Sequence, residues 1–242
     1  DASSMFLWQA LTQVVGDRDG LKVLDLCAAP GGKSTLLSTY FHNGLVVSNE
    51  VIKQRASVLV ENMSKWGASN TVVTNNDPVH FQSLPGFFDV MVVDAPCSGS
   101  GLFRKDPSAI EGWSLDLVAL CAQRQQRILA DALPALALGG TLIYATCSYD
   151  PNEDEHIADW LVNEMGLTPQ AIDINNYPGI VESIAPISKA PGYRFYPDQI
   201  KGEGFFIAAF KKEKEVGVAL TSFKSKEAVL EKFTKKMQEQ VA

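Results

Sequence analysis

The sequence lacks the marks of membrane and secreted proteins. None of its apolar runs approaches the roughly 20 residues that a membrane-spanning helix needs, and no signal-peptide pattern stands at its start. Its four cysteines, Cys27, Cys97, Cys121 and Cys147, have the spacing of neither a zinc site nor a disulfide framework. We therefore expect a cytoplasmic protein with free thiols and no bound metal.

An excess of positive charge is also missing. The 242 residues carry a net charge of −7; the tail from Lys211 to Ala242 holds eight Lys and five Glu, a charge of +3, which leaves −10 on residues 1–210. Proteins that bind nucleic acid through their overall charge are usually basic. The charge argues against a generic nucleic-acid binder, although a local basic groove on an acidic body stays open.

What the sequence does contain is a regular alternation of strand and helix patterns. Strand patterns cover residues 21–26, 44–50, 70–77, 89–96, 139–148 and 202–212. Helix patterns cover residues 5–15, 34–41, 51–67, 115–136 and 154–166. Near-continuous apolar strands that alternate with helices predict an α/β fold, a doubly wound and mostly parallel sheet with helices on both faces. Such sheets bind ligands at the carboxyl ends of their strands.

Individual residues refine these boundaries. Ser3 and Ser4 are placed to cap the first helix, Gly67 to end the third and Pro134 to disturb the fourth. Residues 168–202 are rich in Pro, Gly, Tyr and Asn, and we interpret them as irregular. The Lys-rich residues 211–242 are predicted to form a linker and a helix over 225–240, outside the main domain of residues 1–210.

The stretch CAAPGGKST, residues 27–35, lies between a predicted strand and a predicted helix and suggests a nucleotide-triphosphate loop. That loop requires G-x-x-x-x-G-K-[ST], and Cys27 stands where its first glycine belongs. Pro30 also removes one of the N–H groups that cradle phosphates. The strand DVMVVDAP imitates a magnesium-binding strand, so an NTPase stays an alternative, but a disfavoured one.

An adenosyl cofactor fits the same stretch better. Gly31 and Gly32 allow close approach of a ligand, and acidic side chains follow at the ends of the next strands, Glu50, Asp77 and Asp94. Glu50 is placed to accept hydrogen bonds from ribose hydroxyls, and Asp77 to contact an adenine amino group. Helix capping alone is the alternative interpretation of these carboxylates.

Two of the cysteines also end predicted strands: Cys97 in VDAPCSGSG and Cys147 in ATCSYDPNEDE. We expect both thiols in one cleft, whereas Cys27 and Cys121 have apolar neighbours and are predicted to be inert. A thiolate that adds to carbon 6 of a pyrimidine makes carbon 5 nucleophilic enough to take a methyl group. Lys33 can favour such a thiolate, and Asp94 can hold or protonate the ring nitrogen of a base that has left its stack.

These motifs resemble the Nop2/Sun-type RNA cytosine-5 methyltransferases, which include the bacterial RsmB and RsmF enzymes. The resemblance covers about residues 1–210 and rests on DASSMF, LDLCAAPGGKST, SNE, VDAPCSGSGLFRKDP, ATCSYDPNEDE and RFYPDQIKGEGFF. It implies a seven-stranded, Rossmann-like methyltransferase domain, with Cys147 as the nucleophile and Cys97 assisting product release. It also implies that S-adenosylmethionine is held by Cys27, Ala28, Ala29, Pro30, Gly31, Gly32, Lys33, Glu50, Asp77 and Asp94.

The resemblance is strongest to the RsmF-like branch, which implies 16S rRNA as the substrate and RNA-binding domains outside these residues. Within them, we predict that Arg104 and Lys105 contact phosphate; a solvated turn is the alternative. One departure is Asp198, where many relatives have His. A tRNA cytosine-5 methyltransferase is an open alternative. Two less favoured alternatives are a DNA cytosine-5 methyltransferase that attacks through Cys97 and a non-catalytic binding module.

Overall fold

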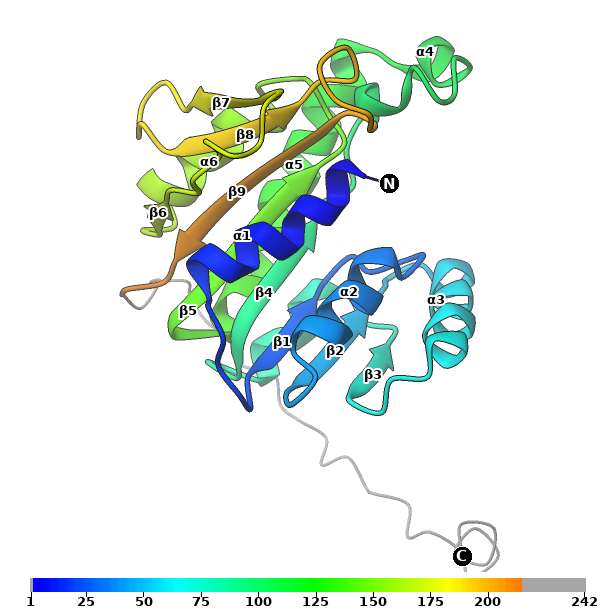
Figure 1. The fold of residues 1–242 in the computed structure, drawn as a ribbon, viewed down its shortest axis with the longest axis vertical. Coiled ribbons are helices and arrows are strands. Elements are labelled where there is room, and N and C mark those ends of the chain that lie inside the picture. The colour runs from blue at the N-terminus through cyan, green and yellow to red at the C-terminus, as the bar shows by residue number, and fades with distance from the viewer. Residues whose placement is uncertain (1, 215–242) are drawn as a thin grey trace, which may run out of the picture.

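A computed structural model of the chain describes residues 2–214. Within these residues lies a nine-stranded sheet with the order β3-β2-β1-β4-β5-β9-β8-β7, and β6 pairs with β9 beside this path (Figure 1). The strands are β1 (Lys22–Asp25), β2 (Leu45–Asn49), β3 (Thr71–Thr74), β4 (Phe88–Asp94), β5 (Leu136–Thr146), β6 (Thr168–Gln170), β7 (Ile180–Ile184), β8 (Pro191–Phe195) and β9 (Phe205–Lys211). The predicted α/β class is confirmed, but the described part of the sheet has two strands more than the seven expected.

The first five strands form the parallel part of the sheet. β1 pairs in parallel with both β2 and β4, β2 pairs with β3, and β4 pairs with β5. The chain runs outward from β1 through β2 to β3 and then returns to β4 on the other side of β1. The order of the strands reverses between β1 and β4, and ligand clefts of doubly wound sheets lie at the carboxyl ends beside such a reversal.

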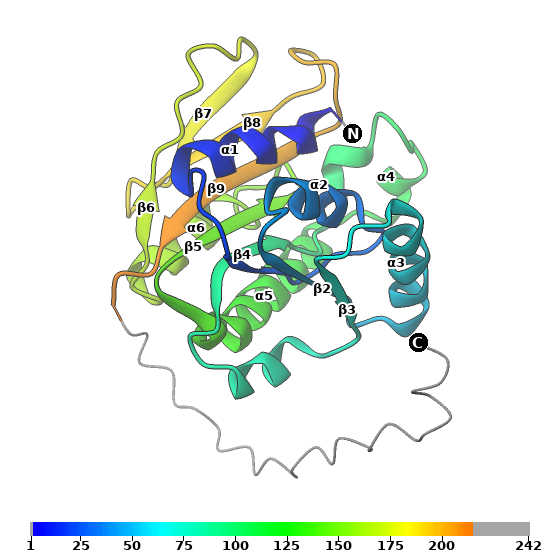
Figure 2. The same ribbon diagram turned by 60° about the horizontal axis from the view of Figure 1, so that its bottom comes forward.

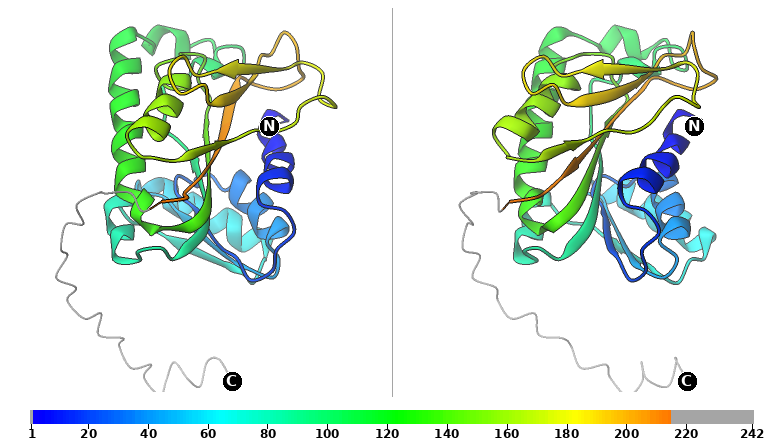
Figure 3. Two further views of the ribbon diagram at one scale, coloured as in Figure 1. Left: turned by 90° about the vertical axis from the view of Figure 1, so that its left-hand side faces the viewer. Right: turned by 60° about the vertical axis from the view of Figure 1, so that its left-hand side comes forward.

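Helices cover both faces of the sheet, which explains why its strands are apolar without alternation. In β4, Val90 and Val92 pack into one core cluster, and Met91 and Val93 into the other. Figure 3 shows α1 and α2 on one side and α5 and α6 on the other. The helices are α1 (Phe6–Val14), α2 (Gly32–Tyr40), α3 (Lys53–Trp66), α4 (Ala109–Gly112), α5 (Leu115–Ala132) and α6 (Glu155–Asn163). Among these described helices, none has the length and apolar character to cross a membrane.

The interpretation of residues 168–202 as irregular is wrong. These residues supply β6, β7 and β8, and β7 and β8 extend the sheet antiparallel beyond β9. The signal was weak because every residue of the short β7 is at least partly exposed. In addition, β8 begins with Pro191 and Gly192 and contains the charged Arg194, which is buried. Residues with low strand propensity hid an element that tertiary contacts stabilise.

The predicted helix boundaries hold at two positions and fail at one. Gly67 follows α3 with φ 77°, the left-handed conformation expected of a C-terminal glycine. Pro134 lies in a short 3-10 helix that follows α5. Ser3 does not cap α1: its hydroxyl donates instead to the carbonyl of Glu203, 2.7 Å away. The helix predicted over 225–240 lies outside the described residues.

The N-terminal segment explains that contact. Figure 2 shows α1 lying along β9 and β8, with its start beside the connection between these two strands. Phe6 packs against Phe195 of β8 with ring centroids 5.3 Å apart. Residues 2–6 are therefore a packing element that brings Ser3 beside the connection between β8 and β9.

Candidate active site

A cleft of about 510 Å³ opens at the carboxyl ends of β1, β2, β4 and β5. Six residues predicted from the sequence line it: Cys27, Ala29, Glu50, Asp94, Cys97 and Cys147. A smaller hollow of about 110 Å³ shares part of this lining and adds Ala28, Pro30, Gly32 and Lys33. Of the residues predicted to bind the cofactor, Gly31 and Asp77 line neither hollow. The parallel topology thus brings together side chains that lie up to 120 positions apart, from Cys27 to Cys147.

The glycine loop, residues 27–33, is shaped by helix α3. Gly31 has φ 114°, which side chains rarely adopt, and a Cβ there would lie 3.2 Å from Leu59. Arg55 donates to the carbonyl of Ala29 (2.8 Å), and Asn62 to that of Pro30 (2.7 Å). Two carbonyl groups of the loop are therefore fixed by side chains of α3.

The strand-end carboxylates have different surroundings. Glu50 is buried; it accepts from the backbone N–H of Ile52 (2.9 Å) and lies 3.2 Å from the Arg55 guanidinium. Asp77 lies three residues beyond β3, caps a 3-10 helix through the N–H of Val79, and lies 3.7 Å from Arg127. Capping thus accounts for Asp77, although the cleft wall beside it includes Arg127. Glu50 and Asp94 are the carboxylates that line the cleft itself.

Lys33 and Asp94 form an ion pair at the smaller hollow, which both residues line. The Lys33 ammonium lies 2.7 Å from the Asp94 carboxylate, and the Lys33 side chain is only 17% exposed. The same ammonium lies over the ring of Phe205, 5.3 Å from its centroid. This pairing holds the Asp94 carboxylate at the cleft, where it can accept hydrogen bonds, and it keeps a cation near Cys147.

The thiols of Cys97 and Cys147 lie in one cleft, as the strand ends predicted, with their sulfur atoms 3.0 Å apart. Their shared hydrogen bond lowers the pKa of Cys147, and Lys33 lowers it further, while burial and Asp94 oppose both. The same hydrogen bond, together with burial, raises the pKa of Cys97 well above its usual value. These opposite pKa shifts favour a thiolate at Cys147 that accepts a hydrogen bond from the thiol of Cys97.

The other two cysteines differ from this pair. Cys121 is buried, and burial raises the pKa of its thiol. Burial also raises the pKa of Cys27, and the nearby carboxylates of Asp25 and Asp94 add to this effect. Both side chains are held as neutral thiols, which agrees with their interpretation as inert residues.

A buried carboxylate that the sequence patterns did not single out joins the two cysteine segments. Glu153 accepts from the N–H and the hydroxyl of Ser98, at 2.7 and 2.5 Å, and from the hydroxyl of Ser148, at 2.6 Å. Ser98 follows Cys97, and Ser148 follows Cys147. Glu153 therefore fixes the spacing of the two thiols from behind.

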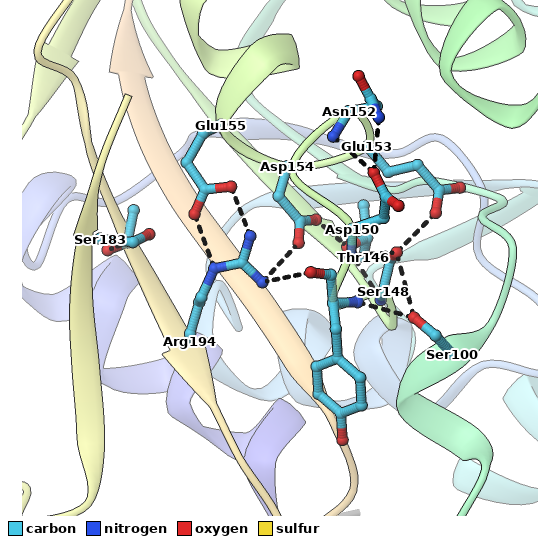
Figure 4. A network of polar contacts seen from close by, with 12 residues as sticks. Ser100, Thr146, Ser148, Asp150, Asn152, Glu153, Asp154, Glu155, Ser183 and Arg194 are labelled. Carbon is cyan, nitrogen blue, oxygen red and sulfur yellow. Dashed lines mark hydrogen bonds and ion pairs between the residues drawn. The ribbon is translucent and has the colours of Figure 1, made fainter. Parts of the chain in front are cut away.

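Arg194 supports the same turn from β8 (Figure 4). Its guanidinium lies 3.0 Å from the carboxylate of Asp154, contacts Glu155, and donates to the carbonyl of Tyr149 at 3.1 Å. Asp154 also accepts from the hydroxyl of Thr146 at 2.6 Å. Of the three acids of NEDE, Glu153 thus binds serines beside both cysteines, Asp154 binds Thr146 and Arg194, and Glu155 binds Arg194. The motif was visible in the sequence, but its partners lie on segments that no pattern pairs with it.

The predicted phosphate contacts, Arg104 and Lys105, stand at the end of the cysteine loop, residues 97–105. Arg104 is occupied within the chain: it donates to the carbonyls of Pro197 (3.0 Å) and Gly202 (2.5 Å) and lies 3.4 Å from the carboxylate of Glu203. Lys105 is exposed. Both side chains are exposed, but the Arg104 guanidinium has partners within the chain, and the phosphate contacts stay a prediction.

A protein-family description agrees with this constellation. The family "16S rRNA methyltransferase RsmB/F" matches residues 12–211. The chain belongs to the RsmB/F family. The ribosomal RNA small subunit methyltransferases F of Pectobacterium atrosepticum and Vibrio cholerae are each 35% identical to it over 215 residues, which is 88% of this chain. The chain spans only 43% and 44% of the lengths of these two relatives.

A solved methyltransferase structure has a similar fold. NSun6 from Pyrococcus horikoshii, solved with SFG, is 26% identical to this RsmB/F family member and superposes with a TM-score of 0.73. The match covers 86% of this chain and 52% of that one. The Rossmann-like methyltransferase fold expected from the motifs is thereby confirmed.

Proposed function

We propose that this chain is the catalytic part of an S-adenosylmethionine-dependent RNA methyltransferase that methylates carbon 5 of a cytosine in 16S rRNA. The observation that carries the proposal is the pair of thiols 3.0 Å apart at the end of the cleft, with the pKa of Cys147 lowered and that of Cys97 raised. Direct methyl transfer to an oxygen or nitrogen atom needs no such pair. Family membership supports the rRNA substrate, since the relatives bear that name.

The residues present fit the cofactor. Ala28, Ala29 and Gly32 line the smaller hollow, so small side chains leave the backbone of the loop open to close approach there. Glu50 offers a buried carboxylate beside it for ribose hydroxyls. SFG, present in the NSun6 structure, is an analogue of S-adenosylmethionine. When bound, S-adenosylmethionine supplies an electrophilic methyl group. Residues 27–33, Glu50 and Asp94 would hold it, and Asp77, whose partner Arg127 lines the cleft, would contact its adenine amino group.

Cys147 begins the proposed reaction. Its thiolate gives an electron pair to carbon 6 of the cytosine, and the carbon 5–carbon 6 double bond supplies the pair with which carbon 5 takes the methyl group. Asp94, held by Lys33, orients the base by accepting hydrogen bonds. The target cytosine must leave its stack to reach this depth.

Cys97 completes the reaction. After Cys97 has released its own proton to solvent, its thiolate takes the proton from carbon 5, directly or through a water molecule. The electrons of that carbon–hydrogen bond restore the double bond and expel Cys147 as a thiolate. One proton is released for each methyl group transferred, and both cysteines return to their starting states.

Denaturing electrophoresis of cysteine variants with in vitro-transcribed 16S rRNA and S-adenosylmethionine tests the proposal. Cys147→Ala should form no protein–RNA adduct and no 5-methylcytosine. Cys97→Ala should still attack and methylate but release slowly, which leaves an adduct that survives denaturation. The reverse pattern, an adduct with Cys147→Ala and none with Cys97→Ala, would overturn the assignment. It would favour the mechanism of a DNA cytosine-5 methyltransferase, in which Cys97 attacks.

We also propose that domains outside these residues supply most of the grip on RNA. Residues 1–210 carry a charge of −10, and the chain spans less than half of its curated relatives. The isolated chain should bind 16S rRNA weakly, and addition of the flanking parts should tighten binding and steepen its dependence on salt. Equal affinity of the isolated chain and the longer protein would contradict this proposal. A tRNA substrate would show itself as adduct formation with tRNA in place of rRNA.

A further inference from the structure

Arg104 connects two loops that border the cleft. It lies at the end of the cysteine loop that starts with Cys97, and its guanidinium donates to the carbonyls of Pro197 and Gly202. These carbonyls belong to the β8–β9 loop, residues 196–204, which runs beside the cysteine loop in Figure 1. One planar side chain thus spans both ends of the β8–β9 loop, a geometry that the rigid fork of an arginine permits and the single ammonium of a lysine does not.

The β8–β9 loop is in turn linked to the backbone of Cys147. The N–H of Gly204 donates to the carbonyl of Gly101 (3.0 Å), and the N–H of Gly101 donates to the carbonyl of Cys147 (2.8 Å). A Cβ on Gly101 would lie 2.7 Å from both the Cys147 and Gly204 carbonyl oxygens, so the backbone segments at Gly101, Cys147 and Gly204 are in direct contact. Movement of the loop would therefore reach Cys147 through two hydrogen bonds.

The surroundings of Arg104 do not suit a phosphate. Two of its N–H groups, one on each terminal nitrogen, bind carbonyls, and the carboxylate of Glu203 lies 3.4 Å away. A phosphate would compete with these acceptors and would be repelled by the carboxylate. On the far side, the loop is held by the hydroxyl of Ser3 on the Glu203 carbonyl and by Tyr196, which stacks on Tyr149 with ring centroids 5.6 Å apart.

We propose that Arg104 is a positioning residue: it fastens the β8–β9 loop to the cysteine loop and so holds the backbone of Cys147 in its attacking position. The proposal rests on the function proposed above, in which Cys147 is the nucleophile. It differs from the sequence prediction, which assigned Arg104 to an RNA phosphate. The two roles predict opposite responses to a substitution that keeps the charge.

The test uses the full chain with Arg104→Lys and Arg104→Ala. Amide hydrogen exchange is measured at Gly101 and Gly204, and kcat and KM are measured with in vitro-transcribed 16S rRNA and S-adenosylmethionine. Both variants should exchange faster at Gly204 and lose about 10- to 100-fold in kcat, because a small misplacement of a reacting group has effects of that order. The KM for RNA should stay within about twofold, since no phosphate contact is lost.

Two neighbouring lysines separate charge from positioning. Lys201 is exposed on the same β8–β9 loop, so Lys201→Ala removes one positive charge without touching the guanidinium contacts; it should leave kcat and the exchange at Gly204 unchanged. Lys105→Ala removes the adjacent cation, and if Lys105 contacts phosphate it should raise KM and reduce the salt dependence of binding.

Two results would overturn the proposal. One is an Arg104→Lys variant with the parental kcat beside an Arg104→Ala variant that raises only KM, as a phosphate contact predicts. The other is unchanged exchange at Gly204 in Arg104→Ala, which is measured without RNA. If neither the unsubstituted chain nor the longer protein methylates a cytosine, the proposed function fails, and the exchange measurement still decides whether Arg104 fastens the loop.

Discussion

The two halves of the cleft are built in different ways. In the glycine-loop half, residues 27–33 are held by Arg55 and Asn62 of α3, 26 and 32 positions from their partners, so the supports follow the loop closely in sequence. In the thiol half, Glu153 reaches Ser98 across 55 positions, and Arg104 reaches Gly202 across 98. The first half is a local unit of strand, loop and helix, whereas the second exists only when several distant segments meet.

This difference has a consequence for function. Except at Lys33, which lowers the pKa of Cys147, a substitution in the glycine-loop half should alter one ligand contact and leave the thiols in place, because its supports do not include them. A substitution in the thiol half should disturb both cysteines at once, since Glu153 and Arg104 each join the cysteine loop to another segment. Substitutions at Glu153, Gly31 and Cys97 separate these two behaviours.

The largest effect is expected at Glu153. Glu153→Ala leaves the N–H of Ser98 and two serine hydroxyls without their acceptor in a buried site, which should cost about 2–4 kcal/mol of the free energy of unfolding. It should also lower methylation by about 100-fold or more, because both thiols lose their spacing. Chemical unfolding and initial rates measure the two effects.

Two variants serve as controls for Glu153→Ala: the same substitution at an exposed glutamate, and a glutamine of nearly the same shape at position 153. Glu164 is exposed at the end of α6, so Glu164→Ala should change neither stability nor rate by a measurable amount. Glu153→Gln keeps one acceptor oxygen and should recover part of both losses. Full activity of Glu153→Ala at unchanged stability would show that the thiol pair does not depend on this carboxylate.

The same contrast explains what the sequence could reveal. The parallel strands and the glycine loop are local patterns, so the sequence alone is enough to assign their residues to the strand ends. Arg194 sits in β8 between residues that suggested an irregular segment, and its burial depends on Asp154 and Glu155 40 and 39 positions away in the chain. No local pattern shows such a pairing. The prediction for Arg104 was drawn from its charge and its place after Cys97, and neither reveals which carbonyls lie beside it in the folded chain.

A smaller and more local effect is expected at Gly31. Gly31→Ala places a Cβ at φ 114°, 3.2 Å from Leu59, and should cost about 1–2 kcal/mol of unfolding free energy. The adjacent Gly32 is the matched control, because it opens α2 and a Cβ there meets nothing within 4 Å; Gly32→Ala should keep the parental stability. Isothermal titration should show weaker binding of S-adenosylmethionine to Gly31→Ala, by about tenfold.

The thiol pair should be undisturbed by this change. In Gly31→Ala, the rate at which iodoacetamide alkylates Cys147 should match that of the parental protein, read by mass spectrometry of the modified peptide. A change in that rate as large as the one caused by Glu153→Ala would mean that the two halves are coupled and that the local description of the glycine loop is wrong.

The smallest effect is expected from the hydrogen bond between the thiols, since it is confined to a window of pH. Cys97 is the largest cause of the lowered pKa of Cys147, so Cys97→Ala should raise the pKa of Cys147. At a pH between the two pKa values, less thiolate is then present and alkylation of Cys147 is slower than in the parental protein; above both values the rates converge. Cys97→Ser retains a hydroxyl donor and should keep the pKa of Cys147 below that in Cys97→Ala. The pH profile of alkylation, measured without RNA or cofactor, checks this order, and identical profiles for the parental protein and Cys97→Ala would show that the hydrogen bond does not favour the thiolate at Cys147.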